Sequence, residues 1–84
     1  MFYVYILRSK VNGKFYIGSS RNLEDRIRRH NSGRCAYTKK YLPWKLEYFE
    51  IYSTREEAVR RERYLKSLKS KRVIEVIVGR ASRH

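Results

Sequence analysis

One carboxylate stands at a position where a surface helix usually has an apolar residue. In the segment 55–68, Glu62 follows Ala58 by four residues and precedes Leu65 by three, on the stripe expected to face the protein. Ionisable groups in unusual surroundings often mark functional sites. An i,i+4 ion pair with Lys66 would explain the same position without any function, and the spacing leaves both interpretations open.

Arg26 and His30 form a second candidate pair, four residues apart on one edge of a predicted helix. A guanidinium can hold two phosphate oxygens, and an imidazole can transfer a proton near neutral pH. The alternative is a solvated basic surface, because Arg28 and Arg29 lie beside them. For His30 the spacing alone favours this alternative.

Tyrosines are the remaining candidates. Tyr3 and Tyr5 share one face of a predicted strand, and Tyr16 lies on the strand that returns after the Asn12-Gly13 turn. Phenol groups could therefore cluster on that face. Each tyrosine is interpreted first as a core or interface aromatic, and only second as an acid or base.

The charge of the chain indicates nucleic acid as its partner. Lys and Arg number 21 against eight Asp and Glu, which gives a formal net charge of +13 over 84 residues. Such a charge attracts polyanions through counterion release, and it exceeds what solubility requires. Asp25 is the only aspartate, and the sequence shows no obvious set of converging carboxylates for a two-metal phosphodiesterase, so hydrolysis would use one metal ion or none. Zinc-ligand spacing, a Gly-rich phosphate loop and a serine triad are also missing from the sequence.

Length and composition limit the class of protein. A chain of 84 residues can form one domain with a modest core, and a second domain is excluded. Cys35 is the only cysteine, which excludes an internal disulfide. The apolar run at the N-terminus ends at Arg8, too early for a signal peptide or a membrane span. We therefore expect a soluble, cytoplasmic protein without a membrane partner.

The first half of the chain predicts a β-hairpin and a helix. Residues 2–7 are apolar throughout and suit a strand covered on both faces. Asn12-Gly13 predicts a type I′ turn, with residues 14–18 as the returning strand. Asn22 can cap a helix over residues 23–30. The polar segment 34–41 that follows is expected to be exposed and mobile.

The second half predicts a strand and a helix. Residues 44–52 alternate in polarity, so one face of this strand should carry Leu46, Tyr48, Glu50 and Tyr52. Thr54 and Glu57 form a capping box, which predicts a helix over residues 55–68.

A last, shorter helix is indicated by an apolar stripe between Ser70, a candidate cap, and Gly79, a candidate stop; residues 80–84 should fray. The predicted fold is α/β of the α+β type, a small three-stranded antiparallel sheet flanked by helices in the order β-β-α-β-α-α. One domain should span residues 1–79.

Taken in order, these segments resemble the GIY-YIG nuclease superfamily, in particular its small single-domain members related to the nuclease domain of the excision-repair incision subunit. Tyr3-Val4-Tyr5 stands where that family has its first motif, and Tyr16-Ile17-Gly18 is the second motif unchanged. Residues 23–33 and 56–66 resemble the next two conserved blocks. The resemblance covers about positions 1 to 72.

The resemblance implies a metal-dependent endonuclease that hydrolyses phosphodiester bonds of DNA, single-stranded or branched DNA included, with DNA repair as its setting. Tyr5 and Tyr16 would shape the site and orient or deprotonate the attacking water, with Arg26 and the metal lowering the tyrosine pKa. Arg26 would also hold the scissile phosphate, and His30 would assist proton transfer. Glu62 would be the sole protein ligand of one Mg²⁺ or Mn²⁺ ion. Lys66 would add positive charge at the phosphate.

Two departures from the family pattern keep an alternative open. Tyr3 replaces a glycine of the first motif, and Ile74 stands where many members have an asparagine. The alternative is a DNA- or RNA-binding module of the same fold with weak or no turnover. The bases of the bound nucleic acid would stack on one segment of the protein, and its phosphates would be neutralised there. That segment carries Tyr37, Lys39, Lys40, Tyr41 and Trp44. Trp44 could instead pack inward at the start of the strand. The sequence predicts no oligomeric state.

Overall fold

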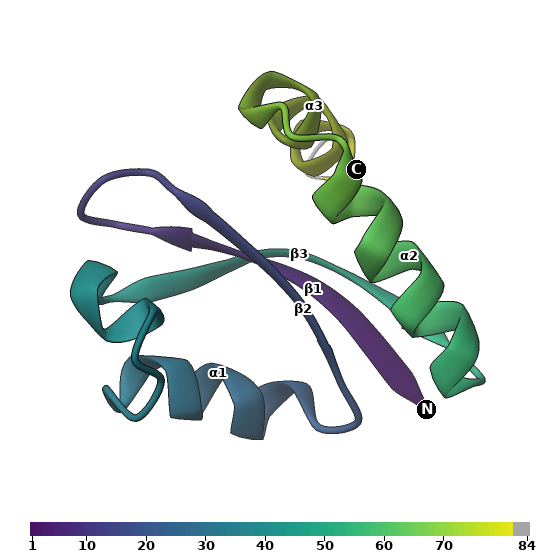
Figure 1. The fold of residues 1–84 in the computed structure, drawn as a ribbon, viewed down its shortest axis with the longest axis horizontal. Coiled ribbons are helices and arrows are strands. Elements are labelled where there is room, and N and C mark those ends of the chain that lie inside the picture. The colour runs from purple at the N-terminus through teal and green to yellow at the C-terminus, as the bar shows by residue number, and fades with distance from the viewer. Residues whose placement is uncertain (82–84) are drawn as a thin grey trace.

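A computed structural model describes residues 1–81 as a three-stranded antiparallel sheet with helices on both faces (Figure 1). This confirms the predicted α+β class and the order β-β-α-β-α-α, to which the structure adds one short 3₁₀ helix, η1. In chain order the elements are β1 (Phe2–Ser9), β2 (Phe15–Ser20), α1 (Leu23–Asn31), η1 (Thr38–Tyr41), β3 (Trp44–Tyr52), α2 (Arg55–Ser67) and α3 (Lys71–Ala81).

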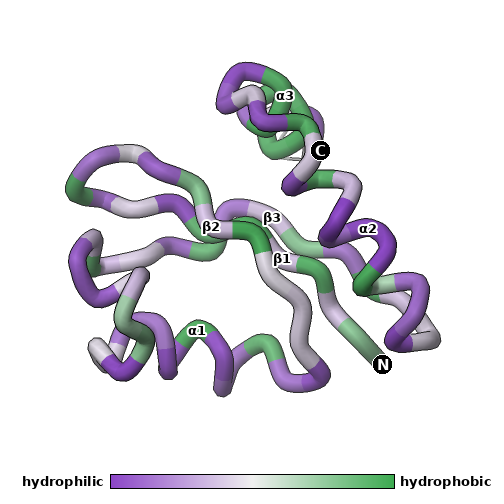
Figure 2. The backbone as a smooth tube through the Cα atoms, in the orientation of Figure 1, coloured by the Kyte–Doolittle hydropathy of each residue, from purple (hydrophilic) through white to green (hydrophobic). Residues whose placement is uncertain are grey.

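β1 is the central strand, in the sheet order β2-β1-β3. Its consecutive residues from Val4 to Leu7 are all buried, because one face of the strand is covered by α2 and the other lies against α1 and η1. In Figure 2 the middle of β1 is green, whereas α1 alternates between purple and green. The continuous apolar run of β1 is therefore explained, as predicted, by burial of the strand on both faces.

Each face of the sheet has its own core. On the side of α2 and α3, the buried side chains are Val4, Ile6, Ala58, Leu65, Ile74 and Val78. On the side of α1 and η1, they are Tyr5, Leu7 and Trp44, with partly buried neighbours such as Tyr16, Leu23 and Ile27. Alternate residues of β1 thus pack against different helices.

A register shift in the pairing of β1 with β3 corrects the alternation predicted for the third strand. Ile6 pairs with Tyr48 but Leu7 pairs with Leu46, so Glu47 is an extra residue in β3. Such a bulge reverses the faces of the residues before it. Leu46 consequently joins the core on the α1 side while Tyr48 packs on the α2 side, and the prediction that they share a face was wrong.

The turn between β1 and β2 also differs from the prediction. A type I′ turn needs positive φ at both central residues, but only Gly13 has it, at 74°, and Asn12 does not. The loop is longer: Ser9 and Lys14 close it through a 2.8 Å backbone hydrogen bond, and Gly13 N–H donates to the Ser9 carbonyl. Ser9 Oγ accepts from Val11 N–H at 3.1 Å, which satisfies a donor inside the loop.

The helix caps are as predicted. The backbone N–H of Asp25 donates to Asn22 Oδ1 at 3.0 Å, and that of Glu57 donates to Thr54 Oγ1 at 3.3 Å. At the C-terminal end, however, Gly79 does not stop α3, which continues to Ala81. The remainder of the tail predicted to fray, residues 82–84, lies outside the described residues.

The segment predicted to be an exposed and mobile loop is partly structured and partly buried. It contains η1, and Thr38 at the start of η1 is fully buried. The Thr38 carbonyl accepts the indole N–H of Trp44 at 2.7 Å. Asn31, at the end of α1, also bonds to the backbone N–H and C=O of Trp44. These hydrogen bonds tie the segment to the start of β3, which local sequence polarity cannot show.

Glu50 anchors β3 to α2. Its carboxylate accepts hydrogen bonds from Tyr48, from Tyr52 at 2.6 Å and from the guanidinium of Arg61 at 3.0 Å. Burial alone would raise the pKa of Glu50, but these hydrogen bonds outweigh it and hold the pKa below its ordinary value. Among residues 1–81, no helix is both long and apolar enough to cross a membrane.

Candidate active site

The candidate site lies along β2, an edge strand. Tyr16 points to the α1 side of the sheet, whereas Ser19 points to the α2 side, because neighbouring positions alternate. At an edge, side chains from both faces can meet around the strand. The five residues implied as catalytic lie on the elements around it: Tyr5 on β1, Tyr16 on β2, Arg26 and His30 on α1, and Glu62 on α2.

A buried hydrogen-bonded chain joins β1, α1 and η1. Tyr5 Oη lies 3.1 Å from His30 Nε2, and His30 Nδ1 lies 3.1 Å from Thr38 Oγ1. His30 is 2% exposed and Thr38 is fully buried. A neutral imidazole fits between two hydroxyls, because one of its nitrogens donates and the other accepts. His30 is therefore fixed in orientation from both sides, and it does not belong to a solvated basic surface.

The aromatic rings of the site are packed together. The Tyr5 and Tyr16 rings are stacked with centroids 6.4 Å apart, and the Tyr16 and His30 rings are 4.6 Å apart. The expected clustering of phenols from the hairpin is thus present, and it includes the imidazole from α1.

Gly18 makes this arrangement possible. Gly18 pairs with Tyr5 across the sheet, and a β-carbon at position 18 would lie 2.5 Å from Tyr5 Oη and 2.7 Å from Tyr5 Cζ. No side chain fits there unless the Tyr5 ring moves. The Tyr5 ring of the first motif can therefore occupy its position only because residue 18 of the second motif is glycine.

The environment changes the proton affinity of two groups in opposite directions. Burial raises the pKa of Tyr5, and the charges of Tyr16 and Glu62 raise it further, while Arg26 lowers it by less. Arg26 therefore lowers the pKa of Tyr5 in the expected direction, but in the protein alone burial outweighs this contribution. Burial also lowers the pKa of His30, and the nearby Arg26 charge adds to this effect. Near neutral pH, Tyr5 keeps its proton and His30 is uncharged.

Arg26 is available for an anion. Its charge acts on both Tyr5 and His30, so it lies within electrostatic range of the two groups. Within residues 1–81 its guanidinium forms no hydrogen bond and no ion pair. It lines a cavity of about 360 Å³ together with Ser19, Ser20, Arg21 and Arg55, among others. This cavity has a strongly positive lining that suits a phosphate group.

Glu62 faces β2 from α2, as its place on the helical stripe predicted. Its side chain is 18% exposed. Ser19 Oγ donates to Glu62 Oε1 at 2.5 Å, and Lys66 Nζ donates to Oε2 at 2.7 Å. The i,i+4 ion pair considered from the sequence is therefore present, and the same carboxylate also lies against the sheet beside the other candidates.

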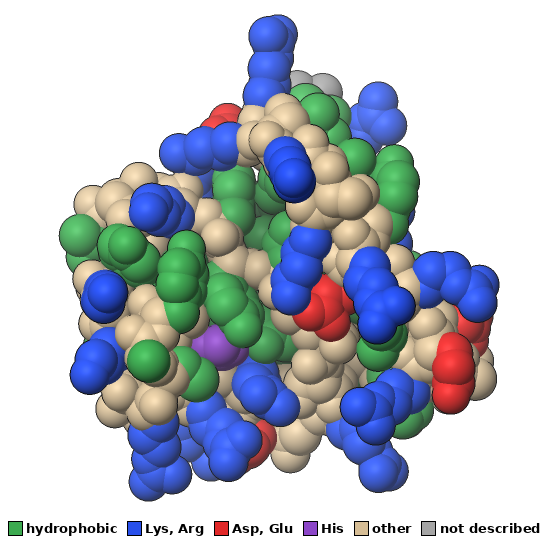
Figure 3. All heavy atoms as spheres, viewed as in Figure 1, with side chains coloured by type: hydrophobic (Ala, Val, Ile, Leu, Met, Phe, Trp, Pro, Cys, Tyr) green, Lys and Arg blue, Asp and Glu red, His purple; other side chains and the backbone are tan. Residues whose placement is uncertain are grey.

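The structure brings Tyr5, Tyr16, Arg26, His30 and Glu62 to one region. The charge of Glu62 reaches Tyr5, and Ser19, the partner of Glu62, directly follows the glycine on which Tyr5 packs. Figure 3 shows this face of the molecule, with Lys and Arg side chains around it and an acidic group among them. No group of three or more His, Cys, Asp or Glu able to hold a metal occurs among the described residues.

The residues predicted to bind nucleic acid divide into two groups. Tyr37, Lys39, Lys40 and Lys66 are exposed, so each is accessible to a ligand. Trp44 is 3% exposed and donates its indole N–H to Thr38, so it is not free to stack on a base. The inward packing considered for Trp44 is the observed one.

Sequence reasoning missed Ser19 and Thr38. Both hold a predicted site residue by a hydrogen bond: Ser19 holds Glu62 and Thr38 holds His30. Ser19 follows the second motif directly, so its alternation with Gly18 could have indicated that it faces α2. Thr38 has no comparable signal, because its burial depends on contacts made after the chain has folded.

Comparison with known families agrees with this geometry, since residues 1–74 match the GIY-YIG catalytic domain. The chain belongs to the GIY-YIG family. Its relatives in this family include a UPF0213 protein of Bacillus licheniformis, 43% identical over 70 residues that cover 82% of this chain and 71% of the relative. A UPF0213 protein of Clostridium perfringens is 42% identical over 82 residues, covering 96% of this chain and 87% of the relative.

A GIY-YIG relative of known structure has the same fold. The solution NMR structure of a UPF0213 protein from Bacillus halodurans aligns with a TM-score of 0.59 and 36% sequence identity, over 94% of this chain and 84% of that chain. These relatives are known as UPF0213 proteins, a name that states no activity. Membership of the GIY-YIG family therefore indicates a nuclease family, and the reaction itself has to be argued from the site.

Proposed function

We propose that this protein is a metal-dependent endonuclease that hydrolyses phosphodiester bonds of DNA. The observation that carries the proposal is the meeting of an unpaired guanidinium, a hydrogen-bonded tyrosine–histidine pair and a carboxylate around one strand edge. A net charge of +13 supports a polyanionic substrate. Family membership supports the reaction class.

The residues present fit a divalent metal with one protein ligand. A carboxylate is the usual ligand of Mg²⁺ or Mn²⁺, and Glu62 already binds one cation, the ammonium group of Lys66. The hydroxyl of Ser19 is a second oxygen at the same place. When bound, the ion would supply positive charge for the phosphate oxygens and the leaving oxygen. With so few protein oxygens, water and substrate phosphate would complete its shell.

The remaining residues would bind, orient and move protons. Arg26 would hold the scissile phosphate in the cavity that it lines and would stabilise the charge that develops there. Tyr16 would limit the space beside Tyr5 through the packing of their rings. Lys66 would exchange its contact with Glu62 for one with the phosphate.

Tyr5 would act on the attacking water through His30. Because burial raises its pKa, Tyr5 is a poor base on its own at neutral pH. As the phenol oxygen accepts a proton from water, its own proton would pass to His30 Nε2, 3.1 Å away. The lowered pKa of His30 leaves it uncharged and able to accept. Thr38 would keep the imidazole in the necessary orientation.

Cleavage of labelled DNA tests this proposal. The purified protein is incubated with single-stranded, duplex and branched DNA, with Mn²⁺, with Mg²⁺ or with EDTA. We expect metal-dependent cleavage of at least one substrate, and a loss of at least 100-fold, on the order typical for a group essential to charge stabilisation, in Glu62→Ala. If Glu62→Ala cuts as fast as the unaltered protein, or no substrate is cut with either metal, the proposal fails.

A binding module without turnover is the second candidate. One observation favours it: both carboxylate oxygens of Glu62 already have partners, Ser19 and Lys66. In addition, Ile74 is 4% exposed and packs in the core, so it supplies no polar contact to the site. This candidate predicts tight, salt-dependent binding of DNA or RNA that Glu62→Ala leaves unchanged, with no cleavage.

A further inference from the structure

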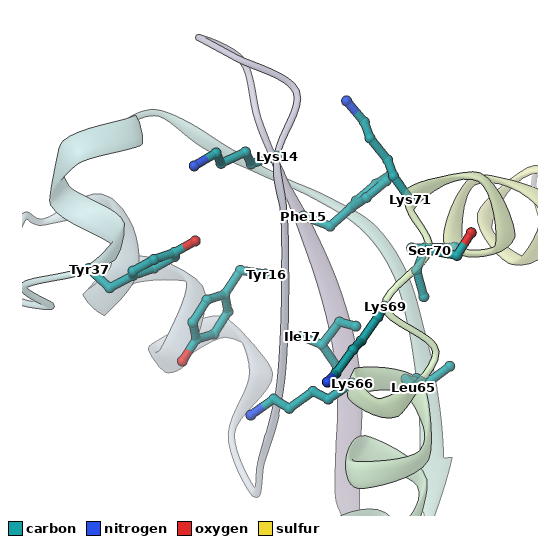
Figure 4. Close-up of a pocket in the computed structure, with 11 residues that line it drawn as sticks. Lys14, Phe15, Tyr16, Ile17, Tyr37, Leu65, Lys66, Lys69, Ser70 and Lys71 are labelled. Carbon is teal, nitrogen blue, oxygen red and sulfur yellow. The ribbon is translucent and has the colours of Figure 1, made fainter.

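A groove with an apolar floor and a lysine rim adjoins the candidate site. It has a volume of about 550 Å³ and lies between the β1–β2 hairpin and the junction of α2 with α3 (Figure 4). The rim carries Lys14, Lys66, Lys69 and Lys71, and the apolar and aromatic lining consists of Phe15, Tyr16, Ile17, Tyr37, Leu65 and Ile74. We refer to it as the lysine groove.

Two rim lysines have no partner of their own. The side chains of Lys69 and Lys71 form no ion pair or hydrogen bond within residues 1–81. Lys71 Nζ lies 3.4 Å from the position that a β-carbon of Gly13 would take, so it reaches the hairpin loop. Two uncompensated ammonium groups at the mouth of one groove favour an anionic ligand.

Lys69 occupies an unusual backbone conformation. Its φ is +49°, and it is the only non-glycine residue with positive φ in the described chain. The position follows the C-cap of α2, where glycine is the usual residue. A lysine there costs backbone free energy, and within residues 1–81 its side chain forms no hydrogen bond or ion pair that would offset this cost. In Figure 4 its side chain extends from the junction toward Lys66, over the groove.

The aromatic lining offers ring surface to a flat ligand. The Tyr16 and Tyr37 rings lie 6.1 Å apart between centroids, and Tyr37 is 52% exposed. Figure 4 shows these two rings on one side of β2, with Phe15 and Ile17 on the other. Aromatic side chains beside lysines are the arrangement by which proteins bind unpaired bases, through stacking and phosphate neutralisation.

The groove is continuous with the candidate site. Tyr16 lines the groove and packs against Tyr5 and His30, and Lys66 lines the groove and binds Glu62. A ligand in the groove would therefore lie beside Tyr16 and the Glu62–Lys66 pair of the candidate site.

We infer that the lysine groove binds an unpaired nucleotide of the DNA strand, adjacent to the phosphate at the candidate site. This rests on the proposed function for the identity of the neighbouring phosphate. An unpaired base exposes its faces to Tyr37, whereas a base within a duplex is stacked between its neighbours and exposes only its edges. Lys69 and Lys71 contact the phosphates on either side of that nucleotide. The preferred substrate is accordingly single-stranded or contains a flap.

Equilibrium binding in EDTA tests the inference. Affinities are measured by fluorescence anisotropy for a labelled single strand and for a blunt duplex of the same sequence. We expect the single strand to bind about tenfold more tightly. Combining Lys69→Ala with Lys71→Ala should weaken single-strand binding about tenfold and reduce the slope of log affinity against log salt by about 1.4, since each phosphate contact contributes about 0.7. Duplex binding should change much less.

The matched control is a variant with two lysines replaced elsewhere. Lys10 and Lys45 are exposed and do not line the groove. Lys10→Ala combined with Lys45→Ala removes the same charge, and should weaken single-strand and duplex binding equally and slightly. The inference is overturned if this control matches the Lys69 and Lys71 variant, or if the duplex binds as tightly as the single strand.

Variants at Tyr37 and Lys69 distinguish an effect on DNA binding from an effect on the stability of the fold. Tyr37→Ala should weaken single-strand binding about tenfold, through the loss of one stacked base. Lys69→Gly removes the ammonium group but relieves the positive φ, so it should raise Tm by about 4 °C while weakening single-strand binding. A Lys69→Gly protein with unchanged affinity contradicts the inference. Because no cleavage is measured, these results are independent of Glu62 and of whether the protein turns over.

Discussion

Lys66 binds the same carboxylate that we propose as the metal ligand, with its Nζ 2.7 Å from Glu62 Oε2. Lys66 is one helical turn further along α2, and its side chain is 54% exposed. The ammonium group and a divalent ion would compete for one oxygen. Metal binding in the absence of DNA should therefore be weaker than the carboxylate alone would allow.

Replacement of Lys66 should strengthen metal binding. In Lys66→Met, the affinity for Mn²⁺ without DNA should rise about fivefold, the upper value for an exposed ion pair. Titration calorimetry, or the electron paramagnetic resonance signal of free Mn²⁺, measures it. Lys69→Met is the matched control, since Lys69 is close by but has no contact with Glu62. Equal affinities in the two variants would show that Lys66 does not compete.

Gly18→Ala should disrupt the site from within the sheet. The new methyl group overlaps the Tyr5 phenol, so the ring must move away from His30, at a cost of about 2 kcal/mol for overpacking. Urea unfolding measures the loss. The control is Gly79→Ala, a position in α3 where an added β-carbon meets nothing within 4 Å and where we expect a gain of about 0.5 kcal/mol. Unchanged stability in Gly18→Ala would mean that Tyr5 is not fixed over position 18.

His30 should make the fold sensitive to mild acid. Its pKa in the folded protein is lowered from 6.5, so between pH 6.5 and that lower value the unfolded chain binds more protons. Stability should therefore fall as pH drops below 6.5, by at most about 1.4 kcal/mol per pH unit. Unfolding curves between pH 8 and pH 5 measure it. His30→Asn should be less stable at pH 8, but its stability should not show this additional fall below pH 6.5. If stability falls equally steeply with pH in both proteins, His30 is not the source of the effect.

Glu50 should make the stability of the fold depend on pH in a more acidic range than His30 does. Its folded pKa lies below the ordinary 4.5, so the stability it contributes is complete above pH 4.5 and is lost as pH falls through the lower value. Glu50→Gln should lose about 1 to 2 kcal/mol at pH 7, because Arg61 and two tyrosines lose a charged acceptor. Glu56→Gln, on the exposed side of α2, should change stability by less than about 0.5 kcal/mol. Similar losses in both would show that the Glu50 network adds little.

The elements of the fold could be predicted because their signals are local. Asn22 and Thr54 cap their helices through hydrogen bonds to residues three positions later, and burial of β1 on both faces follows from its unbroken apolar run. The bulge at Glu47 is different. It depends on how β3 pairs with β1, and a sequence that alternates correctly up to the bulge gives no sign that the faces change there.

The sequence predicted which residues belong to the candidate site, but not the hydrogen bonds that hold them in place. The position of Glu62 on its helix placed it near the sheet, whereas the spacing of His30 alone favoured a solvated surface. The resemblance to the family motifs connected Glu62, Arg26 and His30. The partners Ser19 and Thr38 come from segments 43 and 8 residues away in sequence, and only the folded chain shows them. The raised pKa of Tyr5 has the same origin, since its largest cause is burial, which no motif records.

The proposed reaction centre is assembled from β1, β2, α1 and α2, which span most of the chain and meet only through the sheet. A fragment ending before α2 would lack the acid, and one beginning after β2 would lack both phenols. Hydrolysis would therefore require the complete native state, and its rate would report the fraction of molecules that are folded. On warming, activity should disappear along the same curve as the sheet itself.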